Sequence, residues 1–331
     1  MVKLKHLFTL LILSLTLASS AQQEPQFTQF MFNRLSFNPA FTGVREAICV
    51  NILARQQWVG FTDGENNVFP QTNLFTLDAP VNRLFGRNIN SGIGIQLLTD
   101  KIGYEENLQA RLSYAYKFNV GLGRMSVGAS VGFLNKTIDF SQFVPIDEGD
   151  PIIQGGKETD MLTDLSFGVY YAVSEQYYVG FSVAQILEDD FSAVAIDAPP
   201  YALQRHYYLT GGYYHELPGT NWVINPNVLI KSDMGSTQMD INALGIYNNK
   251  VWGGLSYRAR DAIALMVGGY PFEANNLDRL KLGYAYDITT SRLGGGGRSS
   301  GSHELFANYC FRIIIEREPT GYSDVRYLPT L

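Results

Sequence analysis

Apolar and polar residues alternate with a period of two along much of the chain. The alternation is clearest over Glu106–Val120, where one set of positions is apolar and the positions between them are polar. Arg124–Asn135 and Leu277–Ile288 repeat the pattern. Successive side chains of a β-strand point to opposite faces, so each segment predicts a strand with one apolar and one polar face. A soluble β-sandwich would alternate in the same way, and the pattern alone leaves both architectures open.

The number of strands and the lengths of their connections decide between these architectures. Fourteen strands are expected, near residues 46–58, 70–79, 91–100, 106–120, 124–135, 162–172, 176–185, 203–216, 220–231, 237–247, 249–258, 261–270, 276–288 and 302–315. Connections after even-numbered strands are mostly very short, whereas several after odd-numbered strands are long, including Lys136–Met161 and Ile186–Ala202. The exceptions are a longer even connection around Pro80–Asn90 and a tight odd one at Arg258–Asp261.

This asymmetry is typical of a bacterial outer-membrane barrel, which has an even number of strands, short periplasmic turns and long external loops. Neither a sandwich nor a propeller gives a reason for it, and no repeat of about 40–45 residues indicates a propeller. The sequence therefore predicts an all-β protein that forms a transmembrane antiparallel outer-membrane β-barrel of about 14 strands. The predicted location is the cell outer membrane, crossed many times.

The first 21 residues have the features of a secretory signal peptide. Lys3 and Lys5 precede a short apolar stretch, Leu7–Leu17, and small residues come directly before Gln22. About 11 apolar residues are too few to span a bilayer as a helix, and no cysteine follows them to carry a lipid anchor. The predicted organisation is a signal peptide at 1–21, a periplasmic leader or plug at 22–45, the barrel at 46–315 and a periplasmic tail at 316–331.

Composition and charge agree with a barrel. Aromatic residues make up 13% of the chain, and charged residues only 17% against a usual quarter. The formal net charge of -6 argues against binding to nucleic acid, which requires a basic surface. Trp58, Trp222 and Trp252 are placed at strand ends, where tryptophan prefers the membrane interface, although ordinary core positions would suit them too.

Catalytic and metal-binding patterns are not found. His206, His215 and His303 lack metal-ligand spacing, and no Gly-x-Ser-x-Gly sequence marks a nucleophile. Gly294–Gly297 lacks the lysine of a phosphate-binding loop. The acidic stretches Asp147–Asp150 and Glu188–Asp190 are expected to be solvated loop charge, with divalent-cation binding as the alternative. We expect no enzyme activity, no cofactor and no metal.

Two cysteines suggest a cross-link. Cys49 lies near the start of the first predicted strand and Cys310 near the end of the last, and barrel closure makes these strands antiparallel neighbours. Cys49 shares parity with Asn51, and Cys310 shares parity with Asn308, so both are expected to face the lumen. A disulfide across the closure seam is one hypothesis, and two free thiols are the alternative, since the sequence does not give the register.

Several motifs in order along the chain resemble one family. They are Gln26–Asn33, Asn38–Gly43, Arg55–Gly60, Asp100–Gly103, Tyr114–Tyr116, Gly283–Asp287 and Gly301–Glu304. Together they resemble the PorP/SprF family of the type IX secretion system of Bacteroidetes. The resemblance implies an outer-membrane barrel that assists secretion, anchoring or surface display of large cargo proteins, often adhesins or gliding-motility proteins. It also implies two kinds of partner, namely cargo with a type IX C-terminal domain and the periplasmic ring and lipoprotein components of the machinery.

The leader, Gln26–Gly43, is rich in Phe, Asn and Gln, and Asn38-Pro39 favours a turn. One hypothesis is that the leader enters the barrel as a plug or rim, and a disordered periplasmic leader is the alternative. The candidate structural or partner-binding residues are Phe30, Asn33, Asn38, Pro39, Arg55, Trp58, Asp287, His303 and Glu304. Arg55, Asp287, His303 and Glu304 are the ones expected to offer polar contacts to the leader.

Three functions remain for a barrel of this kind. The first is the handling of type IX cargo by the external loops, by the lumen, or by both. The second is a passive porin for small solutes, and the third is a barrel lipid hydrolase. The periplasmic tail either presents a segment to a partner or is simply solvated.

Overall fold

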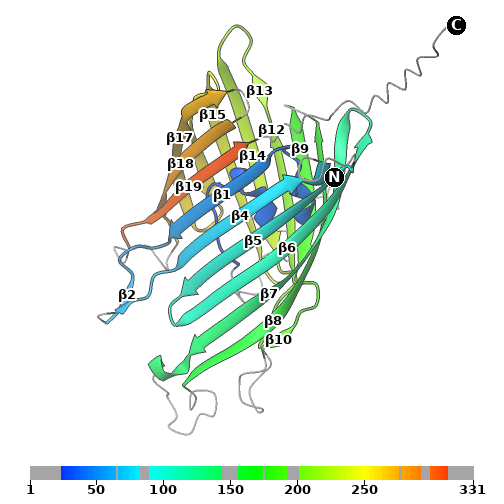
Figure 1. The fold of residues 1–331 in the computed structure, drawn as a ribbon. Coiled ribbons are helices and arrows are strands. Elements are labelled where there is room, and N and C mark those ends of the chain that lie inside the picture. The colour runs from blue at the N-terminus through cyan, green and yellow to red at the C-terminus, as the bar shows by residue number, and fades with distance from the viewer. Residues whose placement is uncertain are drawn as a thin grey trace, which may run out of the picture.

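The computed structural model describes residues 24–64, 66–82, 89–143, 156–173, 176–191, 201–275, 278–291 and 299–311. These residues form a ring of long, tilted strands with the leader inside it (Figure 1). The predicted signal peptide, the tail at 316–331, Asp147–Asp150 and Gly294–Gly297 lie outside the described residues. In the described part of the chain, no helix is long and apolar enough to cross a membrane.

The wall consists of long antiparallel strands. In the described part of the chain there are fourteen: β1 Ile48–Gln56, β4 Gln71–Pro80, β5 Ser91–Ile102, β6 Glu105–Val120, β7 Gly123–Asp139, β8 Lys157–Val173, β9 Tyr177–Ala184, β12 His206–Tyr213, β14 Trp222–Ser232, β15 Thr237–Tyr247, β16 Val251–Arg258, β17 Ala262–Asn275, β18 Asp278–Thr289 and β19 Ser302–Phe311. The two-residue strand β13 (His215–Glu216) extends the pairing of β12 along β14. Two small ribbons lie outside the wall, β2 (Thr62–Asp63) with β3 (Asn66–Asn67), and β10 (Asp190–Phe191) with β11 (Tyr201–Ala202).

The sheet closes on itself. Each long strand pairs with the long strands before and after it in the chain, including β12 with β14. The first strand, β1, pairs with the last, β19, from Ile48↔Phe311 to Gln56↔His303. The prediction of a closed barrel of about fourteen strands is therefore confirmed, and closure pairs the backbone groups that an open sheet edge would leave free.

The two faces of the wall are the reverse of those in a soluble protein. On β6, Leu112, Tyr114 and Tyr116 are each more than half exposed, whereas Arg111 and Lys117 are buried. The same alternation of exposed apolar and buried polar residues recurs along β5 and β16. Apolar side chains that point outward suit a lipid environment, and polar ones that point inward line the lumen.

The barrel has a loop end and a turn end. The loop end carries the long connections that follow β1, β7, β9 and β18, and the turn end carries most of the tight ones. At the turn end, Asn248 and Asn249 join β15 to β16 with φ of 50° and 51°, and Lys250 N–H donates to the Tyr247 carbonyl. A two-residue turn with both φ positive matches the twist of an antiparallel pair. Short loop-end connections also follow β5 and β14, in addition to the predicted one after β16.

Candidate functional site

The leader lies inside the lumen. Residues 24–43, here called the plug, run from the loop end to the turn end and form three short 3-10 turns at Phe30–Phe32, Arg34–Ser36 and Pro39–Phe41 (Figure 1). At the loop end, the Glu24 carboxylate accepts a hydrogen bond from Gln185. At the turn end, Gly43 N–H donates to Asp78 at 3.0 Å. Most plug side chains are buried, so this segment fills the middle of the barrel.

One carboxylate holds the backbone of the plug. Glu304 on β19 is fully buried, and its two oxygens accept hydrogen bonds from the consecutive backbone N–H groups of Thr28 at 2.7 Å and Gln29 at 2.8 Å. The Thr28 hydroxyl donates to Asp287 at 2.8 Å and accepts from Arg55 at 2.9 Å. Hydrogen bonds to a charged group are about twice as strong as neutral ones, so Glu304 is the principal polar anchor of the plug.

Buried charges surround this anchor. Arg55 bridges Asp287 at 2.7 Å and Glu304 at 3.2 Å. Arg258 on β16 bridges Asp240 at 3.2 Å and Asp287 at 3.3 Å. We call Thr28, Arg55, Arg258, Asp287 and Glu304 the seam cluster. Because removing one partner leaves a buried charge uncompensated, each pair is costly to break.

Two members of the seam cluster, Arg55 on β1 and Glu304 on β19, lie on the closure seam, while Asp287 and Arg258 reach it from β18 and β16. Four lumen-facing pairs lie opposite each other along the seam: Cys49↔Cys310, Asn51↔Asn308, Leu53↔Phe306 and Arg55↔Glu304. The first pair is a disulfide with a Cα–Cα distance of 4.1 Å, and the Asn308 amide donates to Asn51 at 2.6 Å. The seam is therefore joined by a covalent bond, an amide hydrogen bond, an apolar contact and an ion pair. The plug contacts the last two of these, at Phe306 and at Glu304.

Aromatic residues pack the plug against the lumen wall. The Phe32 ring lies 4.8 Å from Trp252 and 5.3 Å from Phe306. Phe30 is buried in the same apolar cluster. The placement of Trp252 at the membrane interface is wrong, because its position on β16 faces the lumen, where it is 4% exposed. Trp222 is 43% exposed at the turn end and lies against Tyr247.

Arg34 anchors the part of the plug nearer the turn end, and it was not among the residues predicted from the sequence. Its guanidinium lies 3.7 Å from the centre of the Tyr178 ring and donates to the hydroxyls of Tyr170 at 3.0 Å and Tyr214 at 3.1 Å. A planar guanidinium both stacks on aromatic rings and donates along fixed directions. The only signal in the sequence was a lone arginine within an aromatic and amide-rich leader.

Asn38 and Pro39 fix the last turn of the plug to the wall. The Asn38 side chain accepts from Ala40 N–H at 2.9 Å and donates to the carbonyls of Val169 at 2.9 Å and Phe181 at 3.2 Å. Asn38 thus caps the turn that begins at Pro39 and also binds two wall strands. The wall approaches so closely here that a Cβ on Gly128 would lie 2.6 Å from the Ala40 Cα.

The remaining predicted residues divide into those inside the lumen and those elsewhere. Asn33 is buried in the plug, and neither polar atom of its amide has a hydrogen-bond partner among the described residues. Trp58 lies at the loop end, with φ of 56°. The expectation that His303 contacts the leader is wrong. His303 is next to Glu304 on β19, so its side chain points to the opposite face of the wall. Its Nδ1 lies 2.7 Å from the Tyr284 hydroxyl on the outer face.

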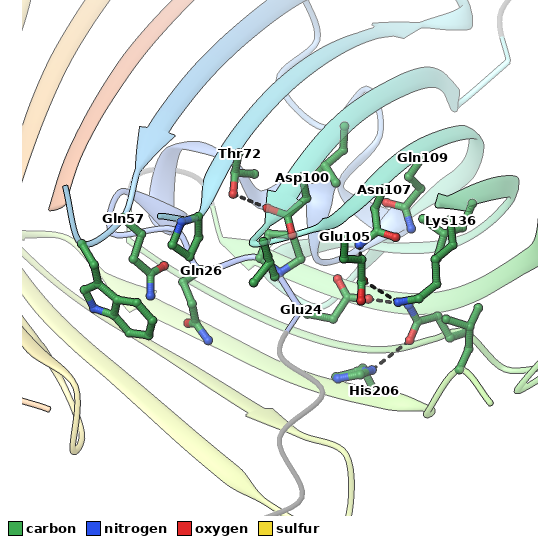
Figure 2. A pocket seen from close by; sticks show the side chains of 18 residues that line it. Glu24, Gln26, Gln57, Thr72, Asp100, Glu105, Asn107, Gln109, Lys136 and His206 are labelled. Atoms are coloured by element: carbon green, nitrogen blue, oxygen red, sulfur yellow. Dashed lines mark hydrogen bonds and ion pairs between the residues drawn. The ribbon is translucent and has the colours of Figure 1, made fainter. Parts of the chain in front are cut away.

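A cavity of about 470 Å³ lies at the loop end of the barrel, next to the start of the plug, and we call it the vestibule (Figure 2). Its lining includes the plug residues Glu24 and Gln26, together with Gln57, Trp58, Thr72, Asp100, Glu105, Asn107, Lys136 and His206. Lys136 forms an ion pair with Glu105, and Asp100 accepts from Thr72 at 2.5 Å. Among the described residues, no group of three or more His, Cys, Asp or Glu side chains is arranged to hold a metal ion.

The chain is similar in fold to several solved barrels. Omp33, an outer membrane protein of Acinetobacter baumannii, shares 10% identity over 81% of this chain and 99% of its own, with a TM-score of 0.43. The toluene transporter TbuX of Ralstonia pickettii shares 12% identity over 87% and 94% of the two chains, with a TM-score of 0.47. The toluene transporter TodX of P. putida shares 10% identity over 85% and 94%, with a TM-score of 0.48. No curated protein sequence matches the chain.

The family is established by a match over most of the sequence. The model of the family described as "Type IX secretion system membrane protein PorP/SprF" matches residues 19–309. That range includes the plug, the seam cluster and nearly the whole barrel. The chain therefore belongs to the PorP/SprF family of type IX secretion system membrane proteins and is a barrel of the outer membrane.

Proposed function

We propose that this barrel assists the secretion, anchoring or surface display of a large cargo polypeptide, which it contacts at its loop end while its lumen stays closed. The observation that carries the proposal is the plug, held by the Glu304 carboxylate through two consecutive backbone N–H groups. A passive porin needs a water-filled lumen, and the plug occupies that space. The proposal gives the chain a binding role without catalysis.

The strength of the plug contacts supports a closed lumen. Removal of the plug from the lumen would expose the buried ion pairs of Arg55 and Arg258 and would take Arg34 away from its aromatic site. It would also expose the apolar cluster around Phe30 and Trp252. Each of these costs free energy, so spontaneous loss of the plug is disfavoured.

The two ends of the barrel suit different partners. In an outer-membrane barrel the long connections face outward, which puts the loop end on the cell surface and the turn end in the periplasm. The ribbons β2–β3 and β10–β11 lie at the loop end, and exposed strands of this kind recruit extended polypeptides by β-strand addition. Ring or lipoprotein components of the secretion machinery would meet the turn end.

Affinity purification tests the proposal. The full-length barrel, tagged at its C-terminus, is isolated from outer membranes in mild detergent, and the co-purifying proteins are identified by mass spectrometry. We expect a large secreted polypeptide together with secretion-machinery components. Recovery of the barrel alone, after cross-linking in intact cells as well as without it, would overturn the cargo role.

A further inference from the structure

The vestibule has the size of a binding site. Its volume of about 470 Å³ falls within the range of about 300–1,000 Å³ that is typical of ligand sites. Glu24 and Gln26 of the plug form part of its lining, so a segment that enters from the loop end meets the plug and stops there. The vestibule therefore suits a chain end or a loop tip that is held at the surface, and not a chain in transit.

The charge of the vestibule favours a cation. Three carboxylates line it, those of Glu24, Asp100 and Glu105, and one ammonium group, that of Lys136 (Figure 2). Lys136 is already paired with Glu105. Asp100 is only 5% exposed, and among the described residues its side chain accepts a hydrogen bond from the neutral hydroxyl of Thr72. A buried carboxylate with a neutral partner gains more from an incoming cation than a solvated one would.

The amides of the vestibule favour a peptide. Gln57 is 7% exposed and lines the cavity, yet its side chain has no hydrogen-bond partner among the described residues. The Asn107 amide donates to Glu105 at 2.7 Å, which leaves its buried oxygen without a donor in the same part of the chain. The Gln57 amide thus has both a donor and an acceptor available in the cavity, and a peptide backbone carries the matching acceptor and donor.

Trp58 supplies an aromatic side chain to the lining of the vestibule. It lines the vestibule and also a second cavity of about 400 Å³ that contains Phe61 and Tyr104. Its backbone is fixed, because Trp58 N–H donates to the Ser302 hydroxyl at 3.0 Å and its carbonyl accepts from Phe61 N–H at 3.0 Å. The face of an indole attracts an ammonium or guanidinium group.

From these observations we propose that the vestibule binds an extended polypeptide segment that carries lysine or arginine. The basic side chain lies among Glu24, Asp100 and Glu105, and the peptide backbone meets the Gln57 amide. On the function proposed above, this segment belongs to the cargo, so the inference rests on that function for the identity of its partner. The vestibule then retains cargo at the surface, with the plug as its floor.

Peptide binding to the purified full-length barrel tests the chemistry. Calorimetric titration in detergent compares a flexible hexapeptide with two lysines against the same peptide with two glutamates. We expect only the lysine peptide to bind, and we expect its affinity to fall as the salt concentration rises. Asp100→Asn and Glu105→Gln should each weaken binding by about tenfold or more, because each removes one partner of a desolvated charge pair.

The strand geometry provides a matched control. Glu106 is the next residue along β6, but its side chain points outward, is 52% exposed and pairs with Lys101. Glu106→Gln should leave binding of the lysine peptide within about twofold of wild type, since surface pairs contribute little. Equal binding of the two peptides, or equal losses in Glu105→Gln and Glu106→Gln, would overturn the inference.

The purification described above separates this inference from the proposed function. If wild type recovers cargo and Asp100→Asn/Glu105→Gln loses it, both stand. If wild type and the double variant recover equal amounts of cargo, the proposed function stands, but the vestibule is not the site that binds cargo. If wild type recovers none but binds the lysine peptide, the chemistry of the vestibule stands and the cargo role fails.

Discussion

Arg55 on β1 and Glu304 on β19 lie directly opposite each other across the closure seam, with Arg55 Nη1 3.2 Å from Glu304 Oε2. The same carboxylate accepts the Thr28 and Gln29 backbone hydrogen bonds of the plug. The binding site of the plug therefore draws on both the first and the last strand and is complete only in the closed barrel. Plug binding and seam closure stabilise each other.

Replacing Glu304 should weaken both the binding of the plug and the closure of the seam. Glu304→Gln keeps the shape of the side chain but removes the charge that faces Arg55, which is 2% exposed. We expect the free energy of unfolding to fall by about 3–5 kcal/mol, as for other broken buried pairs. Urea titration of the heat-modifiable folded form on gels measures this. Glu106→Gln, on the outer face, is the control, and a similar midpoint for the two variants would contradict the assignment.

The Arg34 site should not accept lysine. Arg34→Lys keeps the charge but loses the planar stack on Tyr178 and one of the two hydroxyl contacts. The expected loss is about 1.5–3 kcal/mol, the range for a hydrogen bond to a charged group. The same urea titration measures it, with Arg124→Lys as the control, since Arg124 is 45% exposed at the turn end. A shift no larger than that of the control would show that the stack is unimportant.

A methyl group on the wall should displace the plug. A Cβ on Gly128 would lie 2.6 Å from both the N and the Cα of Ala40, and neither atom belongs to a flexible side chain. Gly128→Ala should therefore make the plug sensitive to trypsin added to purified barrel, while the wall stays folded. Gly253→Ala is the matched change, because its Cβ would meet only the Met266 carbonyl at 3.6 Å. Equal digestion of the two would refute the close contact.

The disulfide should stabilise the seam. Cys49 and Cys310 are separated by 261 residues, so the bond closes nearly the whole barrel sequence into one loop. Removing such a bond costs about 2–4 kcal/mol. We expect a reducing agent to lower the thermal midpoint of wild type but not that of the Cys49→Ser/Cys310→Ser variant. Two titratable thiols in unreduced, unfolded wild-type protein would contradict the bond.

The wall was predictable because lipid on one side and polar groups on the other impose a period of two on every strand. Parity also placed Cys49 and Cys310 in the lumen, although only the folded register brings them opposite each other. The same parity excludes His303 from contact with the plug and places Trp252 with Arg258 in the lumen. The face of each strand, and not the character of the single residue, decides where these two side chains lie.

The contacts of the plug were less accessible from the sequence. The composition of the leader and Asn38-Pro39 favoured a turn-rich segment, but no periodicity identifies which wall residues it meets. Arg34 and Arg258 hold the plug through partners more than 20 residues away in the chain, such as Tyr178 and Thr28. Contacts of this kind depend on the closed barrel and not on local pattern.

Ion conductance of single barrels in planar bilayers tests the central claim, a lumen closed by residues 24–43, most directly. We predict that the wild-type barrel gives no steady conductance steps, whereas a variant that lacks residues 26–43 gives stable open steps. Glu304→Gln should give intermittent steps, which keeps the test valid if the deletion fails to fold. Stable open steps from the wild-type barrel, equal to those of the deletion, would contradict the account.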